Sequence, residues 1–106
     1  MAKFLIQASY SPEGAKGLAK EGGSSRRQVL DSLVKGLGGR LESFYFAFGE
    51  ADAYTIVDLP DNITAFAISL AVNQSGLVSA KTTPLLTCEE FDQAAKKPVG
   101  YRAPGR

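Results

Sequence analysis

Hydrophobic and polar residues alternate in four segments of the chain, and each alternation predicts a β-strand. The first strand is expected at residues 3–10 and the second at 41–48, where aromatic residues favour strand formation. A turn at 49–52 joins the second strand to a third at 53–59, so these two strands should form a hairpin. The fourth strand is expected at 77–86, and Pro84 near its end favours an edge position.

Apolar residues recur at helical spacing in two other segments. The first helix follows Ser25 and Gln28, which resemble a capping box, and ends at the glycines of 36–39. The second begins at Asp61 or Asn62. Its sheet-facing stripe is predicted to be Ile63, Phe66, Ala67, Leu70 and Ala71. Its other face carries Ile68 and Val72, so we expect this helix to pack on a second surface as well.

Three further segments have weaker signals. Ser11 and Pro12 begin a helix, but four glycines between 14 and 23 predict only a short helical turn and a mobile loop. Thr87 and Glu90 form a second capping box and predict a short helix to about Lys97. The tail 98–106 has no periodicity, and we expect either a partner subunit or a crystal neighbour to hold it.

The order strand, helix, strand, strand, helix, strand predicts an α+β fold of the ferredoxin-like βαββαβ type, with a four-stranded antiparallel sheet and an extra short C-terminal helix. Residues 1–97 are expected to form one domain, followed by the irregular tail 98–106. Because both main helices cover one face of the sheet, the other face needs a cover. A second copy is the simplest one, which predicts a homodimer of the dimeric α/β-barrel type.

The composition of the chain argues against several classes of function. The chain has 106 residues, a net charge of +1 and scattered basic residues, so nucleic-acid binding is not expected. No apolar run approaches the roughly 20 residues of a membrane span, and the start lacks a signal peptide, so we expect a cytoplasmic protein without a membrane partner. With no histidine and one cysteine, Cys88, neither a Cys/His zinc site nor a Ser-His-Asp triad can form. No metal or cofactor is expected.

Several short motifs resemble the GYD-domain family of small bacterial and archaeal proteins. They are the run 44–52 (Phe-Tyr-Phe-Ala-Phe-Gly-Glu-Ala-Asp), the Asp-Leu-Pro-Asp of 58–61, the Gly-Gly-Arg of 38–40 and the Lys-Thr-Thr of 81–83. The resemblance covers about Lys3 to Asp92 and implies a dimeric α/β-barrel domain, but it carries no activity to transfer. At the family's signature this chain keeps Gly49 and Asp52 and has Ala51 where tyrosine is usual, so a hydroxyl there is lost unless Tyr54 replaces it.

The sheet face away from the helices is the main candidate for a site. In the predicted topology the first strand is central, and polar residues of three strands share this face: Gln7, Ser9, Tyr54, Asp58, Ser79, Lys81 and Thr83. Buried polar groups need partners, so the pattern fits a small-molecule cavity and fits a hydrated or hydrogen-bonded dimer interface equally well. Strand register is not fixed by the pattern, so an encounter of Asp58 with Lys81 stays open.

Other candidate residues have structural explanations. Gly49 and Asp52 fit a hairpin turn, with a positive φ at the glycine and the aspartate bonding nearby amides; the alternative makes Asp52 a general base at a pocket mouth. Cys88 is expected to be an inert thiol beside Glu89 and Glu90. Adjacent Arg26 and Arg27 are expected to be solvated, with anion binding at a helix start as the alternative.

We therefore expect a homodimeric binding or accessory protein whose barrel holds a small, partly apolar molecule. The first alternative is a cofactor-independent oxygenase or isomerase acting on a small organic substrate. The second is an assembly module, in which the helix of 63–72 and the C-terminal tail join dimers into larger rings.

Overall fold

The computed structural model describes residues 1–106 and contains four strands and four helices. In chain order they are β1 (Ala2–Tyr10), α1 (Pro12–Glu21), α2 (Gly23–Gly36), β2 (Arg40–Phe46), β3 (Ala53–Leu59), α3 (Asn62–Gln74), β4 (Val78–Leu85) and α4 (Cys88–Lys96). The strands form one antiparallel sheet in the order β2-β3-β1-β4. This order confirms the predicted α+β ferredoxin-like fold, with β1 in the centre and β4 at an edge.

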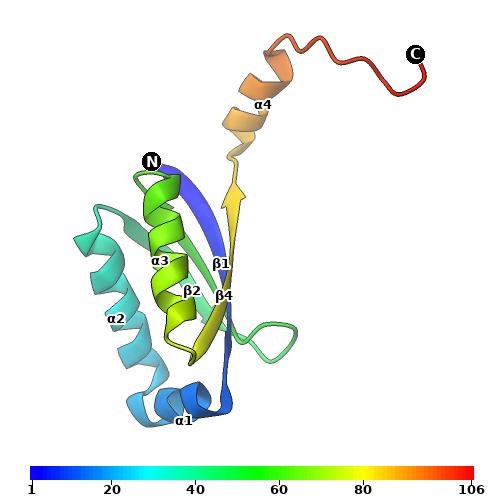
Figure 1. Ribbon diagram of the computed structural model, residues 1–106. Helices are drawn as coiled ribbons and strands as arrows, with labels where there is room; N and C mark the ends of the chain where they lie inside the picture. The colour runs from blue at the N-terminus through cyan, green and yellow to red at the C-terminus, as the bar shows by residue number, and fades with distance from the viewer.

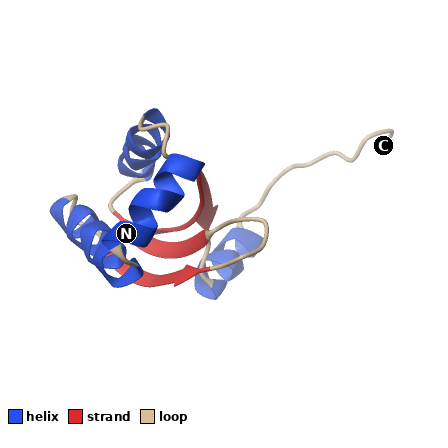
Figure 2. Cartoon of the chain, turned by 90° about the horizontal axis from the view of Figure 1, so that it is seen from below, coloured by secondary structure: helices blue, strands red, loops and turns tan.

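The helices α1, α2 and α3 lie on the concave side of the curved sheet (Figure 2). Strand residues that face them are the most buried, because alternate side chains of a strand point to opposite faces. Phe4, Val57 and Leu59 are almost fully buried and pack with Val34 of α2 and with Ala65 and Ile68 of α3. The core therefore lies between the sheet and the two main helices.

Strand β2 is shorter than its alternation predicted and ends at Phe46. A bulge between Leu41 and Ser43 shifts its register against β3. Phe44 and Phe46 pack edge to face with ring centroids 5.0 Å apart. Phe48 lies outside the strand and is fully exposed, so the predicted strand end at residue 48 was wrong.

Helix α1 is a regular ten-residue helix, so the predicted short turn and mobile loop were wrong. The Ser11 side chain caps it by accepting a hydrogen bond from the Gly14 amide at 3.0 Å. Gly14 is buried because its backbone lies directly against the carbonyl of Leu77. Close packing that only glycine permits therefore offsets the low helix propensity of the segment.

Helix α2 begins earlier than its expected capping box. Its N-cap is Gly22, which has a φ of 97° and provides no side-chain hydrogen bond, so Ser25 lies inside the helix. The predicted end at Gly36 is confirmed.

Helix α3 begins at Asp61, whose carboxylate accepts a hydrogen bond from the Thr64 amide at 2.8 Å. The predicted sheet-facing stripe of this helix was wrong. Ala65 and Ile68 are buried against the sheet and Val72 packs beside them. The residues expected to face the sheet point outward: Ile63, Phe66, Ala67, Leu70 and Ala71. Because both faces of α3 are apolar, helical spacing alone did not distinguish them.

Helix α4 lies beyond the end of β4, away from the body of the domain (Figure 1). The predicted capping box is confirmed: Thr87 Oγ1 accepts from the Glu90 amide at 3.1 Å, and Glu90 Oε1 accepts from the Thr87 amide at 2.8 Å. Every residue of α4 is exposed, and Phe91 shows 67% of its surface. The tail that follows extends further outward, so α4 and the tail have no cover within the chain.

Candidate functional site

The sheet face away from α1–α3, called here the open face, carries all seven residues predicted for a pocket. The register places Gln7 of β1 between Tyr54 of β3 and Lys81 of β4. Thr83 lies opposite Leu5, and Ser9 lies opposite Ser79. Asp58 lies opposite Lys3, in the row next to the pair of Leu5 and Ile56. The structure thus brings the seven residues to one surface, although a single chain does not enclose them.

A short apolar strip lies at the centre of the open face, flanked in the same row by Thr83 of β4 and Ser43 of β2. Leu5 and Ile56 are direct neighbours across β1 and β3, and both remain partly exposed. Tyr45 of β2 lies opposite Tyr54 and shows 71% of its surface. A sheet face with such a strip normally packs against another layer.

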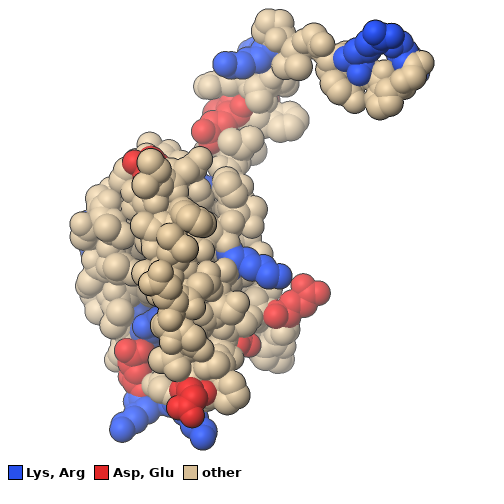
Figure 3. Space-filling view, viewed as in Figure 1, with Lys and Arg blue, Asp and Glu red and all other residues tan.

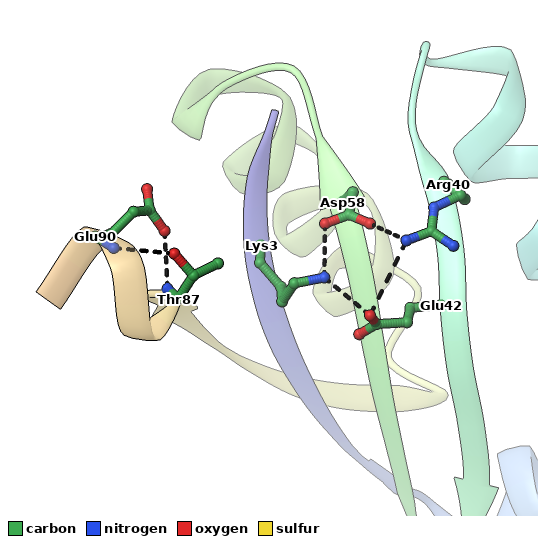
Figure 4. A network of polar contacts seen from close by, with 6 residues as sticks. All are labelled: Lys3, Arg40, Glu42, Asp58, Thr87 and Glu90. Atoms are coloured by element: carbon green, nitrogen blue, oxygen red, sulfur yellow. Dashed lines mark hydrogen bonds and ion pairs between the residues drawn. The ribbon is translucent and has the colours of Figure 1, made fainter. Parts of the chain in front are cut away.

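A network of ion pairs lies at one end of the open face (Figure 4). Lys3 Nζ lies 2.9 Å from Asp58 Oδ1 and 3.1 Å from Glu42 Oε1. Arg40 Nη2 lies 2.9 Å from Asp58 Oδ2 and 4.0 Å from Glu42 Oε1. Asp58 therefore pairs with Lys3 and Arg40, and Lys81 lies in another row, opposite Gln7.

The network shifts two pKa values. The hydrogen bond from Lys3 holds the pKa of Asp58 below its ordinary value of 3.8, although partial burial opposes this effect. The same bond, with that to Glu42, raises the pKa of Lys3 above 10.5. Ionised Asp58 therefore stabilises the fold above pH 3.8, and this contribution is lost as the pH falls through the lower folded pKa. The contribution of Lys3 is present below pH 10.5 and is lost as the pH rises through the raised folded pKa.

We expect Asp58→Asn to lower the free energy of unfolding at pH 7 by about 1–2 kcal/mol, because it removes charge-assisted hydrogen bonds from a carboxylate that is 14% exposed. The difference from the wild type should shrink as the pH falls below 3.8. Urea unfolding at a series of pH values measures this. Glu50→Gln, in the exposed turn, is the control and should leave the stability unchanged. A difference that persisted at the lowest pH would contradict an ionic origin.

The turn of 47–52 is fixed to the central strand by Asp52. Its Oδ2 accepts a hydrogen bond from the Tyr10 amide at 2.9 Å, and its own amide donates to the Ala8 carbonyl at 2.8 Å. Asp52 therefore bonds a backbone amide, as predicted, but this amide belongs to Tyr10 of β1 and not to the turn itself. The expected positive φ at Gly49 was wrong, since it does not have one.

A cavity that was not predicted from the sequence lies on the opposite side of the sheet, between α2 and α3. This inner cavity has a volume of about 50 Å³, and its lining is mostly apolar: it includes Ile6, Leu30, Val57, Ile68 and Val72. An outer groove of about 340 Å³ adjoins it at α1. Tyr10, Arg26 and Val78 line both spaces and so mark their junction.

Arg26 and its neighbour Arg27 differ in burial, although both were expected to be solvated. The Nε atom of Arg26 is buried and has no hydrogen-bond partner in the chain. Arg27 is exposed. Helical spacing could have distinguished the two arginines. Arg26 lies four residues before Leu30 and so shares the helix face that carries the apolar stripe of α2.

Other chemistry is limited. Cys88 is an exposed free thiol at the start of α4. No group of three Cys, Asp or Glu side chains is placed so that it could hold a metal ion. None of the helices has the length and apolarity that a membrane span requires.

Comparison with known proteins gave one family. The family model described as GYD domain matches residues 4–95. The match includes nearly all of α4. No curated protein and no solved structure matched the chain.

Proposed function

The chain belongs to the GYD-domain family, and we propose that this member is a homodimeric protein that binds a small molecule. The observation that carries the proposal is the open face, where an apolar strip at Leu5 and Ile56 is bordered by polar side chains and nothing in the chain covers it. An uncovered face of this kind fits association with an identical face.

Two facing sheets would pack about 10 Å apart. The polar side chains proposed to line the space between them are Gln7, Ser9, Tyr54, Asp58, Ser79, Lys81 and Thr83. Asp58 already has cationic partners, whereas the amide of Gln7 and the ammonium of Lys81 have no side-chain bond within the chain. Such groups, once enclosed, require a ligand, water or the partner's side chains.

Helix α4 supports the dimer independently. It is part of the matched family domain, yet no residue in it is buried. Its apolar side chains recur at helical spacing: Cys88, Phe91, Ala94 and Ala95. In the view along the sheet, α4 lies on the side opposite α1–α3 (Figure 2), which is the side where the second copy would pack. We propose that each α4 packs on the partner subunit.

Native mass spectrometry of gently purified protein tests both parts of the proposal, because one spectrum reports the number of subunits and any retained mass. The wild type should be a dimer carrying a bound small molecule. Ile56→Arg should give a monomer, since it places a charge in the centre of the apolar strip. Ser32→Arg, on the exposed side of α2, is the matched control and should remain dimeric. A monomeric wild type would exclude the barrel.

A second candidate function, assembly of dimers into larger rings, is favoured by the outward face of α3. Ile63, Phe66 and Leu70 show 82%, 64% and 46% of their surface there. Figure 3 shows an uncharged surface over this helix. A bare oligomer larger than a dimer in the same spectra would favour this function over ligand binding.

A further inference from the structure

The inner cavity between α2, α3 and the sheet restricts the shape of an occupant. Its volume of about 50 Å³ is well below that of the engineered cavity of about 150 Å³ that binds benzene. An aromatic ring is therefore too large for it. The apolar lining and the small volume suit a few carbons of an unbranched alkyl chain.

The junction with the outer groove supplies a specific polar group. Arg26 Nε is buried there without a partner in the chain, and a buried donor without a hydrogen bond is destabilising. Tyr10 lines the same junction. A guanidinium is always cationic and binds planar oxyanions well, so it favours a carboxylate at this point.

Two acidic side chains near the junction disfavour an anion that lies away from Arg26. Glu13 and Glu21 line the outer groove, and neither forms an ion pair with Arg26. They would repel an anion placed in the groove itself, and they leave the guanidinium available. A carboxylate is thus favoured only when it is held at Arg26, with its alkyl chain in the inner cavity.

We propose that each subunit has a binding site for an alkyl carboxylate on the helix side of the sheet, with the chain end in the inner cavity and the carboxylate on Arg26. This inference goes beyond the proposed function: the site is separate from the proposed space between two sheets, lies inside one subunit and does not require the dimer.

The test uses methyl NMR of the full chain titrated with sodium butanoate, with butylammonium and 1-butanol as comparison probes. Ile6, Ile68 and Val72 line the inner cavity, whereas Leu5 and Ile56 lie on the open face, so their methyl groups separate the two locations. Butanoate should shift the first three and bind at least tenfold more tightly than butylammonium, because the ammonium cannot accept from Arg26.

Variants of the two adjacent arginines provide a matched comparison. Arg26→Gln should weaken butanoate binding at least tenfold and leave 1-butanol binding unchanged. Arg27→Gln removes the same charge from an exposed position and should change butanoate binding by less than about twofold. If Arg26→Gln does not fold, the comparison of the three probes on the wild type decides alone.

Three results would overturn the inference: no shift of the cavity methyls, shifts of Leu5 and Ile56 alone, or equal binding of butanoate and butylammonium. Shifts of Leu5 and Ile56 alone would support the proposed binding between two sheets and exclude the site on the helix side. Native mass spectrometry reports the dimer separately, so failure of the dimer and failure of this site are distinguishable.

Discussion

Phe91→Glu is expected to convert the dimer into monomers at micromolar concentration. Burial of a phenylalanine side chain contributes about 1.5–3 kcal/mol, and a symmetric dimer with exchanged α4 helices would lose two of them. Since 1.4 kcal/mol corresponds to a tenfold change, the dissociation constant should rise by roughly a hundredfold or more. The effect is expected to be large because Phe91 is 67% exposed in the chain, so the proposed dimer would bury most of its side chain.

Analytical ultracentrifugation over a range of concentrations measures this change. Gln93→Glu adds the same charge to α4 outside its apolar stripe, so it should leave the dimer intact. Thermal unfolding of the Phe91→Glu monomer distinguishes an interface effect from a folding defect, because the exposed Phe91 is expected to contribute little to the stability of its own chain. A dimer of unchanged affinity in Phe91→Glu would show that α4 does not contact the partner.

The second large effect is expected for Gly14→Ala. A Cβ atom at this position would overlap the carbonyl oxygen of Leu77, which also accepts the hydrogen bond from the Ser11 amide at 2.9 Å. The obstacle is backbone, so α1 must move as a whole to relieve the overlap. We expect a loss of about 2 kcal/mol of stability, which lowers Tm by roughly 10 °C.

Gly17→Ala is the matched control in the same helix. No heavy atom lies within 4 Å of the Cβ that it would add. It should therefore stabilise the protein by about 0.5–1 kcal/mol, through higher helix propensity and a less flexible unfolded chain. Urea unfolding of both variants measures the contrast. Equal effects of the two substitutions would mean that Gly14 is not constrained by packing.

Strand alternation predicted much of the fold because a strand has only two faces. In β3 the buried residues Ala53, Thr55, Val57 and Leu59 alternate without exception. The same two-residue period assigned Gln7, Tyr54 and Lys81 to one surface before their register was known. The placement of the open-face residues was thus available from the sequence, whereas their row-by-row pairing needed the structure.

Helices were less predictable because their orientation depends on competing apolar faces. In α3 the larger side chains, Ile63, Phe66 and Leu70, point outward, and the smaller Ala65 packs on the sheet. Ile68 and Val72 pack beside it, so both faces carry large apolar residues and helical spacing suggested the wrong face. A small residue at the centre of the contact allows the helix to approach the sheet closely.

The helix-side site was unpredictable for a different reason. Helical spacing places Arg26, and not Arg27, beside Leu30, but only the packing of α2 shows that the Nε of Arg26 is buried without a partner. A hollow such as the inner cavity arises where packed elements fail to fill a space, and neither periodicity nor composition records this. The ligand class inferred for it therefore comes from the structure.

The central position of β1 has a consequence for synthesis of the protein. Its two hydrogen-bonding neighbours are β3 and β4, and Lys3, near the start of the domain, pairs with Leu85 near its end. A nascent chain therefore cannot complete its sheet until nearly the whole domain has left the ribosome. Contacts so distant in sequence slow folding, and until they form the apolar residues of β1 are without their cover and available to chaperones.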